Sequence, residues 1–305
     1  PKRGAGRSSL ARDPGRAQGM KNAIQKAWSG RNGLACILWP VSLVYRFAIC
    51  VRRYLYKADI LKSASMPVPV IVVGNVVAGG GGKTPLVIAL VQHLKHDGLQ
   101  VGVISRGYGR QSHRCQEVHI STHVNESGDE PLLIKRRTGA PVFVGVKRVS
   151  AAKALLQAYP GTHILVCDDG LQHYALRRDI EIIVFDDRGT GNGWVLPAGP
   201  LREPWPAVAA MVPRILLHTG NKPAFGGFTS TRRLAENAVA LDGTLVPMVN
   251  FGGKPVIALA AIANPPAFFN MLELRGILLD HTIALPDHHN ISQTDFQDFF
   301  DATIL

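Results

Sequence analysis

From residue 67 onward the chain alternates short β-branched runs with longer stretches in which apolar residues recur at helical spacing. This alternation predicts an α/β fold, with a mainly parallel sheet and helices on both faces. We expect strands over residues 68–73, 101–105, 141–144, 163–167, 180–185 and 214–217, and helices over 84–96 and 149–158. A strand over 256–261 and a helix over 267–274 are expected to form a smaller C-terminal α/β part. Ligands of such sheets bind at the carboxyl ends of the strands.

The most hydrophobic stretch lies before this alternation, at residues 34–51, and Arg46 is its only charge. A spanning helix needs roughly 20 apolar residues, so this stretch is marginal for crossing a bilayer. An interfacial helix is favoured because cations and tyrosines follow it, namely Arg52, Arg53, Lys57, Tyr54 and Tyr56. The alternative is an ordinary amphipathic helix packed on the core.

The charge of the chain is concentrated in front of the expected sheet. The formal net charge is +12, and residues 1–62 hold thirteen of the 34 Lys and Arg residues but two of the 22 Asp and Glu residues. The rest of the chain is nearly neutral, which argues against a nucleic-acid partner. A basic segment beside an apolar helix is typical of contact with anionic lipid.

These patterns divide the chain into four parts. Residues 1–19 show no apolar period and are expected to be a leader or extension. Residues 20–62 form the basic, membrane-associated helix, 63–220 the phosphate-binding core, and 221–305 the C-terminal part. The four cysteines, at 36, 50, 115 and 167, form no CxxC pair, which is typical of a reducing cytoplasm.

Residues 77–84 have the context of a phosphate-binding loop, because an apolar strand precedes them and a helix follows. The nucleotide-binding candidates are Val77, Ala78, Gly79, Gly80, Gly81, Gly82, Lys83 and Thr84. Glycines let backbone N–H groups approach phosphate oxygens, Lys83 adds a positive charge, and the Thr84 hydroxyl can bind magnesium. The usual spacing would put a glycine at Val77, so the alternative is a glycine-rich turn with an incidental lysine.

Two carboxylates, Asp168 and Asp169, end another apolar strand. A strand that delivers a carboxylate beside a phosphate loop is the Walker-B arrangement, in which the aspartate holds magnesium. Thr84, Asp168 and Asp169 are therefore the metal candidates. The alternative is an Asp-Gly turn after a buried strand.

Other polar residues follow strands or lie in turn-rich segments. Arg106 and Tyr108 come after the second strand and Arg202 lies in a Pro- and Gly-rich stretch, and the forked arginine head suits phosphate oxygens. Asp129 is either the N-cap of a helix or a carboxylate that accepts a proton from an attacking hydroxyl. Asp287-His288-His289 lacks the further ligands of a zinc site, so a surface pair is the alternative to a catalytic role.

Together these residues resemble the tetraacyldisaccharide 4′-kinases, the lipid A 4′-kinases of Gram-negative bacteria. The matching stretches run in the family's order from about residue 20 to 289 and include the unusual loop spacing. They are Lys26-Ala27-Trp28-Ser29-Gly30, 72–75 through Gly82-Lys83-Thr84-Pro85, Ser105-Arg106-Gly107-Tyr108-Gly109, Gly128-Asp129-Glu130-Pro131, 168–173, 196–204, Ile262-Ala263-Asn264-Pro265 and Asp287-His288.

The resemblance implies a P-loop kinase on the cytoplasmic face of the inner membrane. It implies that the γ-phosphate of ATP moves, with Mg²⁺, to the 4′-hydroxyl of a tetraacyl glucosamine disaccharide 1-phosphate. Lys83 would contact the phosphates, Asp129 and His288 would activate the hydroxyl, and the three metal candidates would lie near Mg²⁺. The implied substrate or phosphate contacts are Arg106, Tyr108, Arg148, Gln172, His173 and Arg202.

The chain departs from the family's pattern near its end. A further Thr-Glu-Lys-Asp-like segment is absent before Leu305, and residues 225–255 match poorly, so we expect a shortened C-terminal part. The rival interpretation is a membrane-targeted P-loop switch ATPase without a lipid acceptor. The Arg- and Tyr-bearing loops and the Asp129–His288 pair favour an acceptor.

Overall fold

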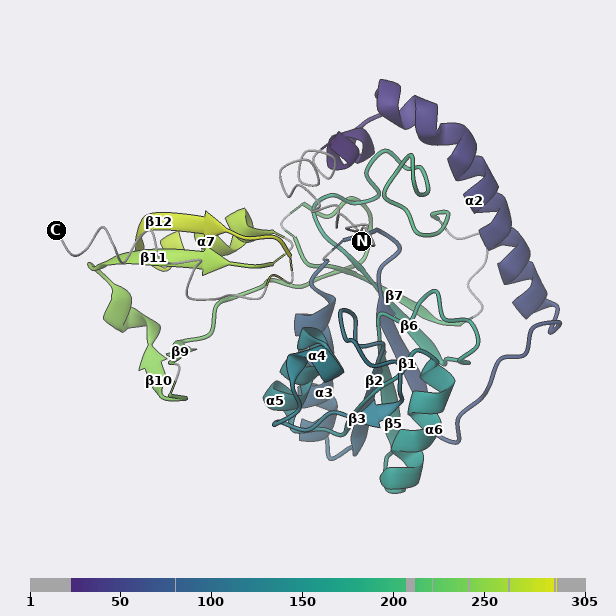
Figure 1. The fold of residues 1–305 in the computed structure, drawn as a ribbon, viewed down its shortest axis with the longest axis horizontal. Coiled ribbons are helices and arrows are strands. Elements are labelled where there is room, and N and C mark those ends of the chain that lie inside the picture. The colour runs from purple at the N-terminus through teal and green to yellow at the C-terminus, as the bar shows by residue number, and fades with distance from the viewer. Residues whose placement is uncertain are drawn as a thin grey trace, which may run out of the picture.

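The central element of the fold is an eight-stranded sheet with the strand order β3-β4-β2-β5-β1-β6-β7-β8 (Figure 1). The structure is a computed structural model, and it describes residues 23–79, 81–206, 212–220, 222–240, 242–262, 264–287 and 289. The strands are β1 (Val70–Gly74), β2 (Val101–Ser105), β3 (Gln116–Glu117), β4 (Val142–Val144), β5 (Ile164–Asp168), β6 (Ile180–Phe185), β7 (Arg214–His218) and β8 (Phe228–Thr229). Apart from β3, which pairs antiparallel with β4, neighbouring strands are parallel.

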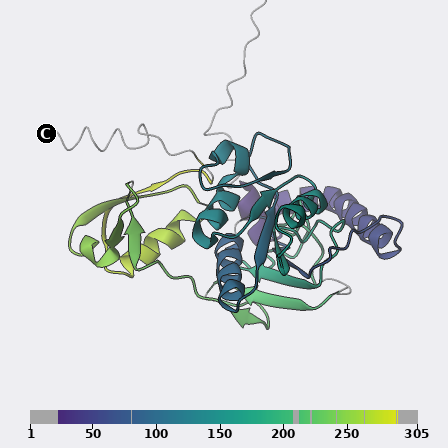
Figure 2. The same ribbon diagram turned by 90° about the horizontal axis from the view of Figure 1, so that it is seen from below.

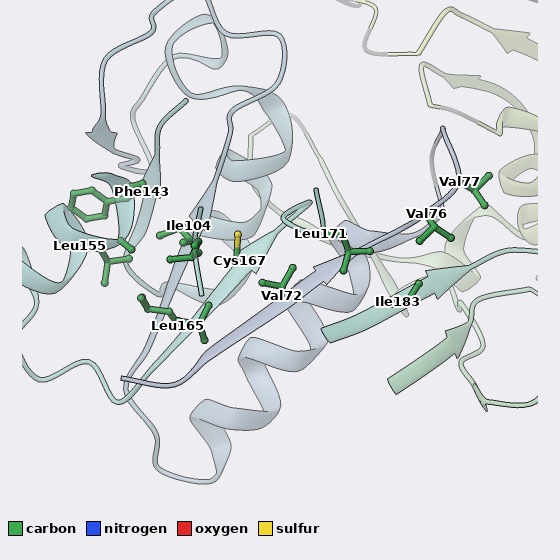
Figure 3. Packing of buried hydrophobic residues seen from close by; sticks show 14 of the residues in the cluster. Val72, Val76, Val77, Ile104, Phe143, Leu155, Leu165, Cys167, Leu171 and Ile183 are labelled. Atoms are coloured by element: carbon green, nitrogen blue, oxygen red, sulfur yellow. The ribbon is translucent and has the colours of Figure 1, made fainter. Parts of the chain in front are cut away.

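Helices cover both faces of this sheet, as the sequence predicts. The helices of the core are α3 (Lys83–His96), α4 (Val124–Ser127), α5 (Asp129–Thr138) and α6 (Arg148–Ala158). In β1, Val70 and Val72 pack with α6 on one face, and Ile71 and Val73 pack with α3 and α5 on the other. Figure 3 shows the first of these clusters. Burial on both faces explains why the strand is a continuous apolar run instead of an alternating one.

The register of the central strands brings polar residues to one edge. Val73 of β1 lies opposite Asp168 of β5, and Ile104 of β2 lies opposite Cys167. Because these strands are parallel, Gly74, Ser105 and Asp168 all end at the same carboxyl edge. The described parts of the predicted phosphate loop, residues 77–79 and 81–84, follow β1 at this edge and lead into α3.

A second unit follows β8 and has its own small core. Its elements are β9 (Asn237–Val239), β10 (Leu245–Pro247), the 3₁₀ helix η1 (Met248–Phe251), β11 (Pro255–Ala260), α7 (Pro265–Glu273) and β12 (Leu278–Ala284). Phe269, Leu272 and Ile277 pack against the β11–β12 pair. Figure 2 shows this unit set beside the core. Because β8 belongs to the large sheet, we propose that the boundary lies between Thr229 and Asn237, beyond the expected residue 220.

The apolar N-terminal stretch forms one long helix, α2 (Gly33–Lys57), along the outside of the core (Figure 1). Among the described residues it is the one helix long and apolar enough to cross a membrane by length and composition, and 11% of its most apolar window is buried. Only a narrow stripe, with Ala35 and Ser42 buried and Tyr45 partly buried, faces the protein. The opposite face exposes large apolar side chains.

Candidate active site

The described part of the phosphate loop, residues 77–79 and 81–84, is fixed by hydrogen bonds to a neighbouring side chain. Gly82 caps α3 in the left-handed region, with φ of 79°, where a side chain is disfavoured. Asn75, which is buried, donates from Nδ2 to the Gly79 carbonyl at 3.0 Å and accepts from Lys83 Nζ at 3.2 Å. The backbone N–H groups that open α3 therefore face the carboxyl edge of the sheet beside a buried lysine. Gly80 lies outside the described residues.

Lys83 and Arg202 share one carboxylate, that of Asp169. Lys83 Nζ lies 3.5 Å from Asp169 Oδ1, and Arg202 Nη1 lies 3.0 Å and 3.1 Å from its two carboxylate oxygens. Burial would raise the pKa of Asp169, but the two cations outweigh it and hold this pKa below its usual range. Asp169 is therefore ionised at neutral pH and holds both cations at the loop.

Asp168 has a different environment, although it is the next residue. Its Oδ2 accepts a hydrogen bond from Ser105 Oγ at 3.0 Å, while its buried Oδ1 has no hydrogen-bond partner among the described residues. Burial, with the nearby carboxylates of Glu130 and Asp169, raises the pKa of Asp168 to about 7. A buried oxygen without a partner beside a phosphate loop is a position that a divalent cation would satisfy.

Thr84 and Glu130 complete the set of oxygen donors near Asp168. Thr84 Oγ1 donates to Glu130 Oε1 at 3.1 Å, which brings the start of α3 to the start of α5. The described residues contain no group of three or more His, Cys, Asp or Glu side chains placed to hold a metal ion. Mg²⁺ is usually held by one or two carboxylates together with phosphates and waters, so hard oxygen donors of this kind fit it.

The raised pKa of Asp168 gives a pH-dependent expectation for stability. An acid whose pKa is higher when folded stabilises the fold most below its unfolded value of 3.8, and this contribution is lost as pH rises through about 7. Without Mg²⁺ at pH 8, Asp168→Asn should therefore raise the melting temperature by at least about 2 °C. The gain should shrink at pH 5, and the exposed control Asp97→Asn should show no such pattern in calorimetry. An equal gain at both pH values would contradict the assignment.

The loop after β5 places three of the predicted substrate residues together. Arg148 donates to the Asp169 carbonyl at 3.4 Å, and its backbone N–H donates to His173 Nε2 at 3.3 Å. Burial and the nearby arginines, Arg148 first, lower the pKa of His173 to about 4, so its ring is neutral at pH 7. Gln172 donates to the Asn75 carbonyl at 3.4 Å. These residues form one polar wall beside the phosphate loop.

A cleft of about 550 Å³ opens between the core and the second unit. Asp129 and Tyr108 line it from the core side, and Ile262, Phe268 and His289 line it from the other side. Asp129 is the first residue of α5 and Gly128 is the N-cap, so of the two alternatives for Asp129 the one that makes it the N-cap is wrong. The next residue, Glu130, accepts a hydrogen bond from Thr84, so the start of α5 lies close to the end of the phosphate loop.

Two further predicted site residues, Arg106 and His288, have no described hydrogen bond to the site. Arg106 is exposed at the end of β2, on the same edge of the sheet. Its charge contributes to the low pKa of His173, so the Arg106 guanidinium is near enough to this ring to act on it electrostatically. His288 lies outside the described residues, and its pairing with Asp129 stays a prediction.

Four residues near the phosphate loop were not singled out as site residues in the sequence: Asn75, Glu130, Arg188 and Arg232. A Cβ atom at Gly79 would lie 3.0 Å from the Arg188 guanidinium, and one at Gly82 would lie 3.2 Å from that of Arg232. Asn75 and Glu130 lie close in sequence to predicted site residues, so their positions in the sequence could have identified them as site candidates. The two arginines come from distant loops, and only the tertiary structure brings them to the loop.

The chain is similar to known proteins over most of its length. The family model of tetraacyldisaccharide-1-P 4′-kinase matches residues 34–304. The tetraacyldisaccharide 4′-kinase of Polaromonas naphthalenivorans (strain CJ2) is 56% identical over 286 residues, which cover 94% of this chain and 83% of that protein. That of Acidovorax sp. (strain JS42) is 52% identical over 281 residues, with 92% and 82% covered.

The fold is also similar to a solved structure, that of LpxK from Aquifex aeolicus in complex with ATP. The TM-score is 0.74 at 30% sequence identity, and the match covers 85% of this chain and 84% of that one. Sequence and structure thus agree over most of the chain, and the chain belongs to the tetraacyldisaccharide-1-P 4′-kinase family.

Proposed function

We propose that this protein is an ATP-dependent kinase that phosphorylates the 4′-hydroxyl of a tetraacyl glucosamine disaccharide 1-phosphate in lipid A biosynthesis. The observation that carries the proposal is the cleft lined by Asp129, whose neighbour Glu130 joins the start of α5 to Thr84 of the phosphate loop. A phosphate loop alone serves hydrolysis as well as transfer. A cleft that is lined by a carboxylate and lies next to the helix in contact with Thr84 provides room for an acceptor hydroxyl.

The phosphate side of the site acts by positioning and charge. Phosphoryl transfer needs little covalent chemistry from the protein, because charge spreads over the transferred group and must be stabilised. Lys83 and the N-terminus of α3 supply that charge, and we propose that Arg188 and Arg232 add to it. Thr84, Asp168 and Glu130 would hold Mg²⁺, which neutralises phosphate charge when bound. Asp169, also a predicted metal residue, instead orients Lys83 and Arg202.

The acceptor side supplies a base and a shaped surface. Asp129 is the group that takes the proton from the attacking hydroxyl, and His288 is its predicted partner. Arg106, Tyr108, Arg148, Gln172, His173 and Arg202 are proposed to contact the substrate or its phosphates. The apolar wall of Leu259, Ile262 and Phe268 gives the cleft a surface suited to a lipid acceptor.

The test is ATP turnover in detergent with labelled γ-phosphate, with and without the disaccharide lipid. Label that enters the lipid at the 4′ position supports the kinase. ATP hydrolysis at the same rate without lipid would contradict the kinase and favour the rival interpretation, a switch ATPase. Product analysis by mass spectrometry distinguishes the 4′ position from other hydroxyls.

We further propose that the protein lies on the cytoplasmic face of the inner membrane as a monotopic protein. Residues of α2 from Ala35 to Arg53 face the core at intervals. At 1.5 Å per residue they cover about 27 Å, which leaves little of the helix free to cross a bilayer. The other face exposes Ile37, Val44 and Phe47 by 70–75% of their surface, as expected for contact with acyl chains.

This arrangement predicts a large effect of one exposed apolar residue on membrane binding. Phe47→Ser should weaken binding to anionic phosphatidylglycerol vesicles by about tenfold or more, because burying one Phe side chain contributes about 1.5–3 kcal/mol. Vesicle flotation measures the effect. Leu274→Ser, an equally exposed apolar change in the second unit, is the matched control and should bind as the unchanged protein does. Equal weakening in both variants would contradict the orientation.

A further inference from the structure

A loop segment, residues 192–205, lies between α2 and the phosphate loop and contacts both. We call it the connecting segment. Its Ala198 and Leu201 are completely buried, and its Glu203 is only 8% exposed. The buried backbone N–H and C=O groups of an irregular segment need hydrogen-bond partners, and here α2 and the phosphate loop can provide them. The hydrogen bonds of the connecting segment therefore show how it joins these two elements.

On one side the connecting segment is fixed to the N-terminal helices. Ser42 Oγ of α2 accepts from the Ala198 backbone N–H at 2.9 Å, and the Tyr45 hydroxyl donates to the Arg202 carbonyl at 3.2 Å. Trp28, before α2, donates from Nε1 to the Pro197 carbonyl at 2.9 Å. Burial and the nearby Glu203 carboxylate raise the pKa of Tyr45, so its hydroxyl keeps the proton that it donates.

On the other side the same segment is fixed to the site. The Ala78 N–H donates to the Pro200 carbonyl at 2.7 Å, and the Arg202 N–H donates to the Val76 carbonyl at 2.6 Å. Arg202 then reaches Asp169, which also holds Lys83. The backbone carbonyl of Arg202 thus accepts a hydrogen bond from α2, while its side chain is paired with the Asp169 carboxylate.

Glu203 adds a second connection between the same elements. Its Oε1 accepts from Gln172 Nε2 at 2.8 Å, its Oε2 accepts from the Tyr174 hydroxyl, and Arg53 of α2 lies 3.9 Å from Oε2. Burial, followed by the Glu203 charge, raises the pKa of Tyr174, which keeps that hydroxyl a donor. A buried carboxylate is costly unless such donors satisfy it, so Glu203 fixes the loop after β5 against α2.

We propose that Tyr45 and Glu203 are positioning residues that hold Arg202 and Gln172 in their catalytic places from the side of the membrane helix. Helix α2 then has two roles, because its exposed face meets lipid while its buried stripe sets the geometry of the site. The inference rests on the proposed function, since Arg202 and Gln172 act there on phosphate or substrate. It assigns to α2 a direct effect on the transfer rate, in addition to membrane attachment.

The test is a double-mutant cycle on Tyr45→Phe and Arg202→Lys, assayed for label transfer to the lipid in detergent. Tyr45→Phe removes one hydroxyl and should lower kcat about three- to tenfold with KM for ATP unchanged, the range of one lost hydrogen bond. In the Arg202→Lys background the same change should have little further effect, because Tyr45 acts through Arg202. Glu203→Gln should lower kcat by a similar factor, with Glu203→Asp less affected.

Controls separate positioning from folding and from membrane binding. All four tryptophans of the chain lie at or beside this contact, at positions 28, 39, 194 and 205, so intrinsic fluorescence reports its integrity. The assay in detergent removes the need for membrane binding, and Leu274→Ser, an exposed apolar change in the second unit, should keep the kcat of the unchanged protein. Additive effects of Tyr45→Phe and Arg202→Lys, or an unchanged kcat in Tyr45→Phe, would overturn the inference. Absence of lipid labelling by the unchanged protein would instead refute the proposed function.

Discussion

Replacing Lys83 with alanine is expected to lower the rate of phosphate transfer by about 10²–10³-fold, the range for losing one preorganised electrostatic group. Lys83 is buried against Asn75 and Asp169, so its charge acts where water does not screen it. Its loss also removes one of the two cations paired with Asp169, and the excess negative charge beside the phosphates opposes ATP binding. The measurements are steady-state label transfer to lipid and the dissociation constant of ATP.

Two matched variants make the Lys83 result specific. Lys153→Ala removes the same charge from the exposed surface of α6 and should leave the rate unchanged. Lys83→Arg keeps the charge but replaces a compact ammonium with a planar fork, so it should recover little activity. Full activity in Lys83→Ala would contradict the assignment of the phosphate loop.

Local sequence pattern was sufficient for the core of the fold. The apolar run at 70–73, the glycines and the apolar spacing after Lys83 each act over a few residues, and they predicted β1, the loop and α3. The end of β5 at Asp168 was predicted for the same reason. Long-range packing did not need to be known, because a strand buried on both faces has an unambiguous composition.

Elements stabilised by partners were harder to predict. Strand β12 was missed because its exposed Asp280, His281 and Thr282 give it no apolar run, and pairing with β11 stabilises it. The different environments of Asp168 and Asp169 were equally hidden in the sequence. A φ of 46° at Asp169 turns the chain there and sends the two carboxylates to different partners.

The narrow contact stripe of α2 illustrates the same limit. Its apolar composition predicted a helix at a surface, but the hydrogen bond that Ser42 accepts and the one that Tyr45 donates decide which face meets the protein. Those bonds depend on the connecting segment, more than 150 residues away in sequence. Charge and composition therefore predicted that α2 contacts lipid. Only the tertiary contacts indicate that α2 is also connected to the candidate active site.

Replacing Asp129 with asparagine is expected to reduce transfer to the lipid by about 10²–10⁴-fold, the usual contribution of a positioned base. The amide keeps the size of the side chain but cannot accept the proton of the hydroxyl. ATP binding should be unchanged, because neither Lys83 nor Thr84 is among the residues that line the cleft with Asp129. Isothermal titration with ATP and Mg²⁺ measures binding, and label transfer measures chemistry.

The separation of the two measurements is what tests the role of Asp129. Asp129 opens α5, where a negative charge favours the helix N-terminus by about 0.3–1 kcal/mol, so a small loss of stability is expected and is followed by melting temperature. Glu126→Gln, an exposed carboxylate on the neighbouring α4, is the matched control and should transfer phosphate at the unchanged rate. If Asp129→Asn instead weakened ATP binding in proportion to its loss of transfer, Asp129 would belong to the nucleotide site and the base would have to be sought elsewhere in the cleft.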